Sequence, residues 1–365
     1  MLPIGNEPSA ASPGPAATGC VPLVRICAGL VLLVIGAFSS PAQALSADGF
    51  ATVGAPGTGS STVTGGAGGP EVTVTTGADL MKYADMNGPY VINVSGKLTI
   101  HDMDTHVRSN KTIIGKGADA TLDGGGLYLY KASNVIIRNL TIQGSGDDCM
   151  GLLLSSNIWI DHCTFQDAKD GNLDIRRASD NITVSWCKFC YSARQDHAFS
   201  CLLGSSDTET DCEGKLHVTF HHNWFGDNVI ERMPSIRFGT VHLYNNYYNS
   251  SASEYCVRVR LSAQARLEHN CFEGVKNPWE VYVTNPAHVL GRVLAKDNLE
   301  INTTWGTTTT SKKDKSVRMI VPGTDNVFTP PYAYSPDPAS KVKELVTSSA
   351  GAGKLPATTL PAGAP

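Results

Sequence analysis

One nine-residue pattern recurs six times in the chain at a nearly constant interval. Within each copy apolar residues alternate with polar ones, as they do along a strand with one buried face. The copies begin at Asn134, Asn157, Asn181, His217, Thr240 and Gln264, so successive starts are 23, 24, 36, 23 and 24 residues apart. A strand–helix–strand unit needs about 30 residues or more. The repeat therefore predicts an all-β solenoid, whose coils bury together a face that none could bury alone.

Composition agrees with one large β domain. The chain has 365 residues, of which 41% are apolar and 17% charged, so it can bury a sizeable core. The net charge is -4 without a block of like charges, which leaves no basic surface for nucleic acid. An anionic ligand would have to be held by local charges.

The first 44 residues have the features of an export signal. An apolar run follows Arg25, and Ala42-Gln43-Ala44 fits the small-x-small cleavage pattern. The run of about 13 apolar residues is shorter than the roughly 20 that cross a membrane. We therefore expect residues 1–44 to be an N-terminal extension and signal peptide, and the mature protein to be secreted without membrane contact. Residues 45–347 should form the solenoid domain, and residues 348–365 a disordered, low-complexity tail.

The seventh position of the repeat predicts buried polar rows. It is Asn223, Asn246 and Asn270 in the last three copies, where stacked amides could hydrogen-bond along the solenoid axis. It is Cys163 and Cys187 in two earlier copies. Neighbouring strands lie about 4.8 Å apart, so these two cysteines could form a disulfide or stack as free thiols. Stacking is the favoured interpretation, because an inward position already has a packing reason to be cysteine.

The one long interval predicts a projecting loop. Its surplus of 12 residues, "GSSDTETDCEGK", is bracketed by Cys201 and Cys212, which could close its base. No cysteine pair comes with histidines at zinc-site spacing. Since loops on a rigid scaffold often carry function, we expect the functional groove near this coil.

Five chemistry-bearing residues fall at similar places in successive repeats. Asp148, Asp170, Asp174, His197 and Arg232 follow the starts of their repeats by 13 to 17 residues. In stacked coils a similar offset means the same side of the solenoid, so these residues should line one longitudinal groove.

The three carboxylates of this strip predict a metal site. Fully extended, residues 170 and 174 would be about 13 Å apart, so we expect the chain to bend at Gly171-Asn172. The sequence offers no obvious cation to match the carboxylates, and their repulsion would be relieved by a hard, oxygen-seeking ion, most naturally Ca²⁺. A lone Asp-x-x-x-Asp is ordinarily a solvated loop, and Arg232 could be a surface arginine. The shared offset favours the metal site.

Several segments resemble those of a known family. "NVIIRNLTI", "NIWIDHCTF", "DGNLDI", "NITVSWCKF", "LLGSSD" and "ERMPSIRFGTVHLYNNYY" are similar to signature segments of the family 1 pectate lyases, within a resemblance that covers roughly residues 48–355. It implies a right-handed parallel β-helix with long loops forming a substrate groove. It also implies Ca²⁺-dependent cleavage of polygalacturonate by β-elimination, in an enzyme expected to be a monomer.

The resemblance assigns roles residue by residue. The calcium carboxylates of the family match Asp148, Asp170 and Asp174, with Asp147 as an outer contributor. Arg232, the first arginine of "RMPSIR", matches the residue proposed to abstract the C5 proton of the sugar. Arg237 matches a substrate-binding arginine. Arginine is an awkward base because it holds its proton firmly. A basic pH optimum and a strongly cationic site would ease this difficulty without removing it.

One position departs from the family. Many members have a substrate-binding lysine before the "LLGSSD"-like segment, where this chain has Phe199. His197 is the candidate for a neighbouring polar contact with substrate, or for a supporting role behind such a contact. The alternatives are a pectin lyase acting on methylated pectin, which would not need the calcium carboxylates, a polygalacturonase, which would hydrolyse with paired carboxyl groups, and a non-catalytic β-helix that binds the polymer.

Overall fold

The computed structural model describes residues 47–54, 63–285 and 287–355, without the side chains of residues 102–104. The signal peptide expected over residues 1–44 and the last ten residues lie outside the described part. Among the described residues, no helix is long and apolar enough to cross a membrane.

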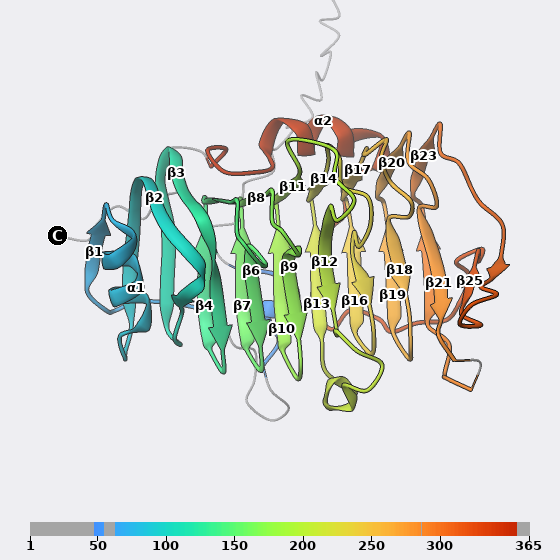
Figure 1. Ribbon diagram of the computed structural model, residues 1–365, viewed down its shortest axis with the longest axis horizontal. Coiled ribbons are helices and arrows are strands. Elements are labelled where there is room, and N and C mark those ends of the chain that lie inside the picture. The colour runs from blue at the N-terminus through green and yellow to red at the C-terminus, as the bar shows by residue number, and fades with distance from the viewer. Residues whose placement is uncertain (1–46, 55–62, 286, 356–365) are drawn as a thin grey trace, which may run out of the picture. The chain divides into compact units, whose positions relative to one another are not determined.

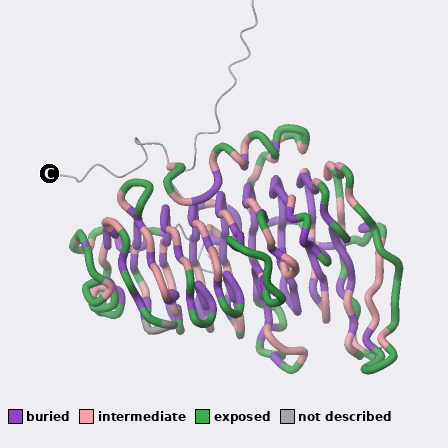
Figure 2. The backbone as a smooth tube through the Cα atoms, turned by 45° about the horizontal axis from the view of Figure 1, so that its top comes forward, coloured by how far each residue is buried: buried purple, intermediate pink, exposed green. Residues whose placement is uncertain are grey.

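The described chain is a right-handed parallel β-solenoid of about nine turns, which confirms the predicted fold (Figure 1). The repeats stack in register as expected: Ile160 pairs with Val184, Val184 with Phe220, and Phe220 with Leu243. All four side chains are fully buried. Alternation within each repeat therefore sends one apolar face into a shared interior (Figure 2).

Three parallel sheets run along the solenoid. The first contains β1 (Glu71–Val74), β4 (Ser133–Arg138), β7 (Ser156–Asp161), β10 (Asp180–Ser185), β13 (His217–His221), β16 (Thr240–Tyr244), β19 (Gln264–Glu268) and β22 (Arg292–Lys296). The second contains β5 (Thr141–Gln143), β8 (Thr164–Gln166), β11 (Lys188–Cys190), β14 (Trp224–Phe225), β17 (Tyr247–Tyr248), β20 (Cys271–Glu273) and β23 (Leu299–Ile301). The third contains β6 (Met150–Leu153), β9 (Gly171–Arg176), β12 (Phe199–Leu203), β15 (Ser235–Ile236), β18 (Val257–Val259) and β21 (Trp279–Val283).

Two long strands and an antiparallel pair complete the sheets. Strands β2 (Tyr90–His106) and β3 (Lys111–Tyr130) each extend around a coil, and β3 pairs with β4, β5 and β6, one strand in each of the three sheets. Strand β25 (Val317–Met319) pairs antiparallel with β21 and with β24 (Thr309–Thr310). Strands β24 and β25 thus cover the edge of the third sheet at β21, which would otherwise offer unpaired backbone groups.

Rows of like side chains stabilise the interior. In the second sheet Phe165, Phe189, Phe225, Tyr248 and Phe272 stack with successive ring centroids 5.1, 5.0, 4.9 and 4.5 Å apart. All five side chains are fully buried. Because each coil repeats the same inward position, each ring covers the next along the axis.

The predicted asparagine row is present. Asn223 Nδ2 donates to Asn246 Oδ1 at 2.9 Å, and Asn246 Nδ2 donates to Asn270 Oδ1 at 3.0 Å. The row continues to Asn298, which the sequence argument did not include. These bonds satisfy buried amides that would otherwise destabilise the core.

All eight cysteines in the described part are free and buried. Cys163 and Cys187 stack, with the Cys163 amide donating to Cys187 Sγ at 3.4 Å, so the favoured interpretation is confirmed. The possible link between Cys201 and Cys212 is not formed. Cys201 lies on β12, while Cys212 ends the 3₁₀ helix η2 (Thr210–Cys212) in the long loop, where its thiol donates to the Arg177 carbonyl.

Short helices pack on the solenoid. Helix α1 (Gly77–Asp85) begins at the Thr76 cap and buries Leu80 and Ala84 in the main core, next to β2. The 3₁₀ helix η1 (Gly49–Thr52) contacts the first sheet. Helix α2 (Ala339–Ser349) lies along the second sheet, where Val342 and Val346 pack near Tyr247 (Figure 1).

The C-terminal segment differs from the expected tail. Residues 348 and 349 end α2, and the amides of Gly351, Ala352 and Gly353 donate to Trp186 O, Thr164 Oγ1 and Asn139 Oδ1. Residues 348–355 are therefore held on the solenoid by these bonds. The small residues at these positions permit the chain to approach the coils closely, which a compositional prediction of disorder does not take into account.

Candidate functional site

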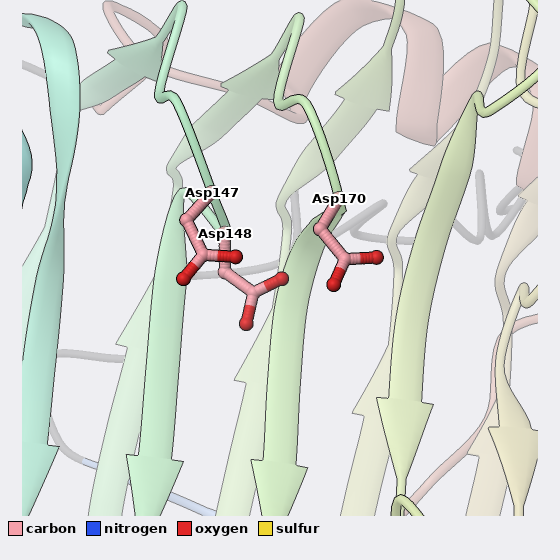
Figure 3. Close-up of side chains that lie close together, drawn as sticks. All are labelled: Asp147, Asp148 and Asp170. Atoms are coloured by element: carbon pink, nitrogen blue, oxygen red, sulfur yellow. The ribbon is translucent and has the colours of Figure 1, made fainter.

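Carboxylates from two neighbouring coils meet on the outward side of the third sheet. Asp147 and Asp148 precede β6, and Asp170 precedes β9 (Figure 3). One oxygen of each residue lies within 4.8 Å of the others. Because β6 and β9 are paired, the turn before each strand presents its acidic residue at the same level of the solenoid.

Asp174 approaches the same group from within β9. A Cβ atom placed at Gly171 would lie 2.8 Å from Asp174 Oδ1 and 3.1 Å from Asp148 Oδ1, so glycine leaves room for both carboxylates. The Gly171 amide also donates to Asp148 Oδ1 at 2.9 Å. The predicted bend at Gly171-Asn172 is wrong, since β9 is continuous from Gly171 to Arg176. Asp148 of the adjacent coil, rather than a bend, connects Asp170 with Asp174.

Arg176 is a neighbouring cation that the sequence argument missed. Its Nη2 lies 3.6 Å from Asp148 Oδ2, and its Nε lies 3.7 Å from Asp174 Oδ2. The statement that no cation matches the carboxylates is therefore wrong. Strand alternation could have found this residue, because it lies two positions after Asp174 and so on the same face.

The carboxylates remain short of positive charge despite Arg176. Burial, and then the charge of Asp174, raise the pKa of Asp148 to about 8. Burial also raises the pKa of Asp174 to about 6, against the opposing effect of Arg176. Asp174 Oδ1 is buried without a hydrogen-bond partner. Buried carboxylate oxygens that lack both a matching positive charge and a hydrogen-bond donor are suited to bind a hard cation.

These shifts predict how stability depends on pH without added metal. The folded pKa values lie above the usual 3.8, so between about pH 4 and 8 the folded protein holds protons that the unfolded chain releases. We expect the free energy of unfolding of chelator-treated protein to fall as pH rises through this window, and Asp148→Asn to flatten the dependence. Urea unfolding at several pH values checks this. Equal pH slopes in wild type and variant would contradict it.

Arg232 lies on the loop between β14 and β15. Its backbone is left-handed, with φ of 61°, and its guanidinium carbon lies 4.3 Å from the centre of the Phe199 ring. Its Nη1 is 4.0 Å from Asp170 Oδ1, and 22% of its side chain is exposed. Arg232 therefore stands beside the carboxylates with part of its surface open to solvent.

His197 and Phe199 complete this side of the strip. His197 Nε2 lies 2.9 Å from Asp170 Oδ1, and its ring centroid is 3.9 Å from that of Phe199. Asp170 thus contacts both His197 and Arg232. The structure brings together the five residues that the repeat offsets placed on one side, while their roles stay predictions.

Arg237 is held by a residue of the long loop. Its Nε donates to Asp207 Oδ1 at 2.6 Å and its Nη1 to Gly204 O at 2.9 Å. Asp207 also contacts Arg260 at 3.8 Å and accepts a short hydrogen bond from Thr284. Asp207 was not predicted as a site residue, although it belongs to the "LLGSSD" segment. Arg237 is buried and oriented by these contacts, with Nη2 taking no partner among the described residues.

Two adjacent histidines at the end of β13 contact distant segments of the chain. His221 and His222 join by their Nδ1 atoms at 2.9 Å, and their Nε2 atoms contact Asp48 and Asp337. Burial lowers the pKa of His222 to about 4. These contacts tie segments near both ends of the described chain to β13 and the residue that follows it, on a different sheet from the carboxylates.

Comparison with known proteins shows which family the chain belongs to. A profile of the pectate lyases matches residues 20–355. The chain belongs to the pectate lyase family. A pectate trisaccharide-lyase of Bacillus licheniformis is 36% identical over 314 residues, which are 80% of this chain and 84% of the relative. A pectate trisaccharide-lyase of Thermotoga maritima is 45% identical over 199 residues, about half of each chain.

Solved pectate lyases share the fold. A Xanthomonas campestris enzyme has 28% identity and a TM-score of 0.69, covering 84% of this chain and 98% of its own. A pectate lyase from Bacillus sp. N165, solved with trigalacturonate, has 27% identity and a TM-score of 0.67, covering 84% of this chain and 99% of its own. The protein is thus a polysaccharide lyase of the pectate lyase type.

Proposed function

We propose that this pectate lyase cleaves α-1,4-linked polygalacturonate by Ca²⁺-dependent β-elimination to give 4,5-unsaturated oligogalacturonides. One observation carries the proposal: a group of carboxylates with a buried, unpartnered oxygen lies beside Arg232 on one outward face. A hydrolase would require an acid and a base carboxyl group on either side of the bond. Carboxylates gathered around a common point instead suit a bound cation.

The residues present fit calcium. Asp148, Asp170 and Asp174 are the ligands inferred here, with Asp147 close enough to contribute. Ca²⁺ takes oxygen ligands in flexible geometry and tolerates carboxylates of unequal burial. Bound Ca²⁺ would neutralise the uronate carboxylate and so make the neighbouring C5 proton more acidic.

The arginines supply the remaining parts of the reaction. Arg232, with one guanidinium nitrogen unprotonated, takes the proton from C5. The electron pair of that C–H bond becomes the second bond between C4 and C5, the C4–O4 bond breaks, and the leaving oxygen takes a proton from solvent. Arg237, held by Asp207, binds a uronate carboxylate through its remaining nitrogen. Because the base must first lose a proton, activity should favour basic pH.

Phe199 gives this site a chemistry different from that of a lysine. The ring lies against the Arg232 guanidinium and the tilted His197 ring, and it contributes no charge of its own. We therefore infer weaker attraction for a fully ionised uronate at this position than a lysine would give, and better tolerance of a methyl ester there.

Phe199→Lys tests this inference. The added charge should lower KM for polygalacturonate by about 3- to 10-fold and lower activity on methyl-esterified pectin relative to polygalacturonate. Steady-state kinetics on both polymers measure the effect, with Phe199→Leu as the uncharged control without a ring. An unchanged KM for polygalacturonate in Phe199→Lys would count against the inference.

The ultraviolet absorbance of the product tests the proposed reaction. Elimination creates a conjugated double bond and hydrolysis does not, so purified protein with polygalacturonate should give absorbance that rises with time. Chelator should abolish the rise, and added Ca²⁺ should restore it. New reducing ends without absorbance would show hydrolysis, and absorbance unaffected by chelator would refute the calcium requirement.

We also infer export with cleavage after Ala44 and action as a monomer. Pectate lyases are generally extracellular enzymes, and the apolar run and small-x-small site support the same location. N-terminal sequencing of the exported protein and sedimentation of the purified protein test the two inferences.

A further inference from the structure

An aromatic surface lies on the third sheet beyond the carboxylates. The end of β3 extends this sheet before β6, with Leu127 pairing with Met150 and Tyr130 with Leu153. The end of β2 lies beyond it, where His106 pairs with Tyr128. Leu127 and Leu129 are fully buried, so the alternate residues Tyr128 and Tyr130 face outward. Tyr130 is 49% exposed, and Trp305 is the other strongly exposed aromatic residue in the described part of the chain.

The two tyrosine rings, which we call the platform, lie nearly parallel to each other. Tyr128 and Tyr130 have planes 7° apart and centroids separated by 6.4 Å. The exposed His106 ring meets the edge of Tyr128 at 5.3 Å. Parallel rings held on one strand expose a broad apolar face with polar hydroxyl ends. Such a face suits a sugar ring, which has apolar C–H faces and a polar rim.

One lysine without an acidic partner in the described part of the chain lies beside the platform. Tyr130 lines a pocket of about 490 Å³ together with Lys131, Arg108, Asn87 and Asn110. Arg108 is paired with Asp85 at 2.8 Å. Lys131 has no acidic partner among the described residues, and its Nζ lies 5.0 Å from the centre of the Tyr130 ring. An unpaired cation over an aromatic face favours a sugar that carries a carboxylate.

The platform is in register with the catalytic strip. Tyr128 pairs with Gly151, and Gly151 pairs with Asp174. Tyr128 therefore lies two strands, or about 10 Å, from Asp174. Gly151 places no side chain between them. On the other side Asp174 pairs with Leu202, and Leu202 pairs with Ser235, which belongs to the same coil as Arg232. Ser235 is therefore four strands, or about 19 Å, from Tyr128. A polymer lying across the strip could therefore reach the platform, whereas a short oligomer over the reacting centre would not.

We propose that Tyr128, Tyr130 and Lys131 form a distal subsite that binds a galacturonate residue of the polymer, on the side of the carboxylates away from Arg232. The inference rests on the proposed function. The subsite binds part of the substrate far from the reacting bond, so it contributes affinity for long chains rather than chemistry.

Chain-length dependence tests the subsite. In Tyr130→Ala, KM should rise roughly 2- to 10-fold for polygalacturonate, with kcat unchanged, because uniform binding is lost. The KM and kcat of this variant for trigalacturonate should equal those of the wild type. Tyr130→Phe should retain wild-type KM because it keeps the ring. Lys131→Ala should raise KM for the polymer, while Lys313→Ala, which removes an exposed lysine at a distant turn, should not.

The outcomes separate the subsite from the proposed function. An active wild type whose polymer KM is unchanged in Tyr130→Ala overturns the subsite and leaves the lyase assignment intact. An equal rise in the KM of Tyr130→Ala for trigalacturonate and for the polymer also overturns the subsite. If the wild type gives no unsaturated product, the proposed reaction fails, and calorimetric titration with hexagalacturonate decides the subsite separately. Equal affinity of wild type and Tyr130→Ala in that titration overturns it.

Discussion

Replacing Arg232 with lysine should remove most of kcat, by about 100-fold or more, although the positive charge remains. The guanidinium lies over Phe199 and beside Asp170, with its nitrogens at the edge of the strip. An ammonium on a different stem cannot place a nitrogen at the same point. Because the interaction is made only in the transition state, kcat and kcat/KM should fall together while KM changes little.

Arg237→Lys is the matched comparison. That side chain is fixed by Asp207 and Gly204 and is inferred to bind a substrate carboxylate, so its loss should act more strongly on KM. Steady-state kinetics of both variants on polygalacturonate at fixed calcium separate the two roles. Near wild-type kcat in Arg232→Lys would refute the base assignment. His197, which contacts Asp170 at 2.9 Å, would then be the next candidate.

Removing one carboxylate should raise the calcium needed for half-maximal activity by about 10-fold or more. We expect this of both Asp170→Ala and Asp174→Ala, since each provides oxygen close to Asp148. The fold should survive, because these residues lie on the outward side of the sheet and contribute little to the apolar interior. Calcium titration of the lyase rate at saturating polygalacturonate measures the change, and circular dichroism checks folding.

Asp119→Ala is the control for this experiment, because Asp119 is an exposed acid whose carboxylate is distant from the site. It should leave the calcium requirement unchanged. The two substitutions should also differ in their effect on the stability of the protein without calcium. Asp174 is buried with an unpartnered oxygen, so Asp174→Ala should stabilise the chelated protein at pH 8, whereas exposed Asp170 should matter little to that stability. If both variants respond to calcium as wild type does, the ligand assignment is wrong.

Repetition made the fold predictable from the sequence. Six apolar alternations at near-equal spacing allow one arrangement in which every coil buries the same face, and the asparagine row follows from the same register. Similar offsets from the repeat starts likewise placed Asp148, Asp170 and Arg232 on one side. In a solenoid, position within the repeat determines position on the surface, so local sequence was sufficient for these features.

Contacts between coils were decided only by the tertiary structure. The sequence could not show that Arg176 turns toward Asp148, that Asp207 of the long loop holds Arg237, or that the Phe199 ring lies under Arg232. It also predicted a bend in β9 that does not occur, and it left open a disulfide between Cys201 and Cys212, which are both free. Each of these depends on side-chain direction and on the path of an irregular turn. Both are set by packing against the neighbouring coils, which the repeat pattern of the sequence does not describe.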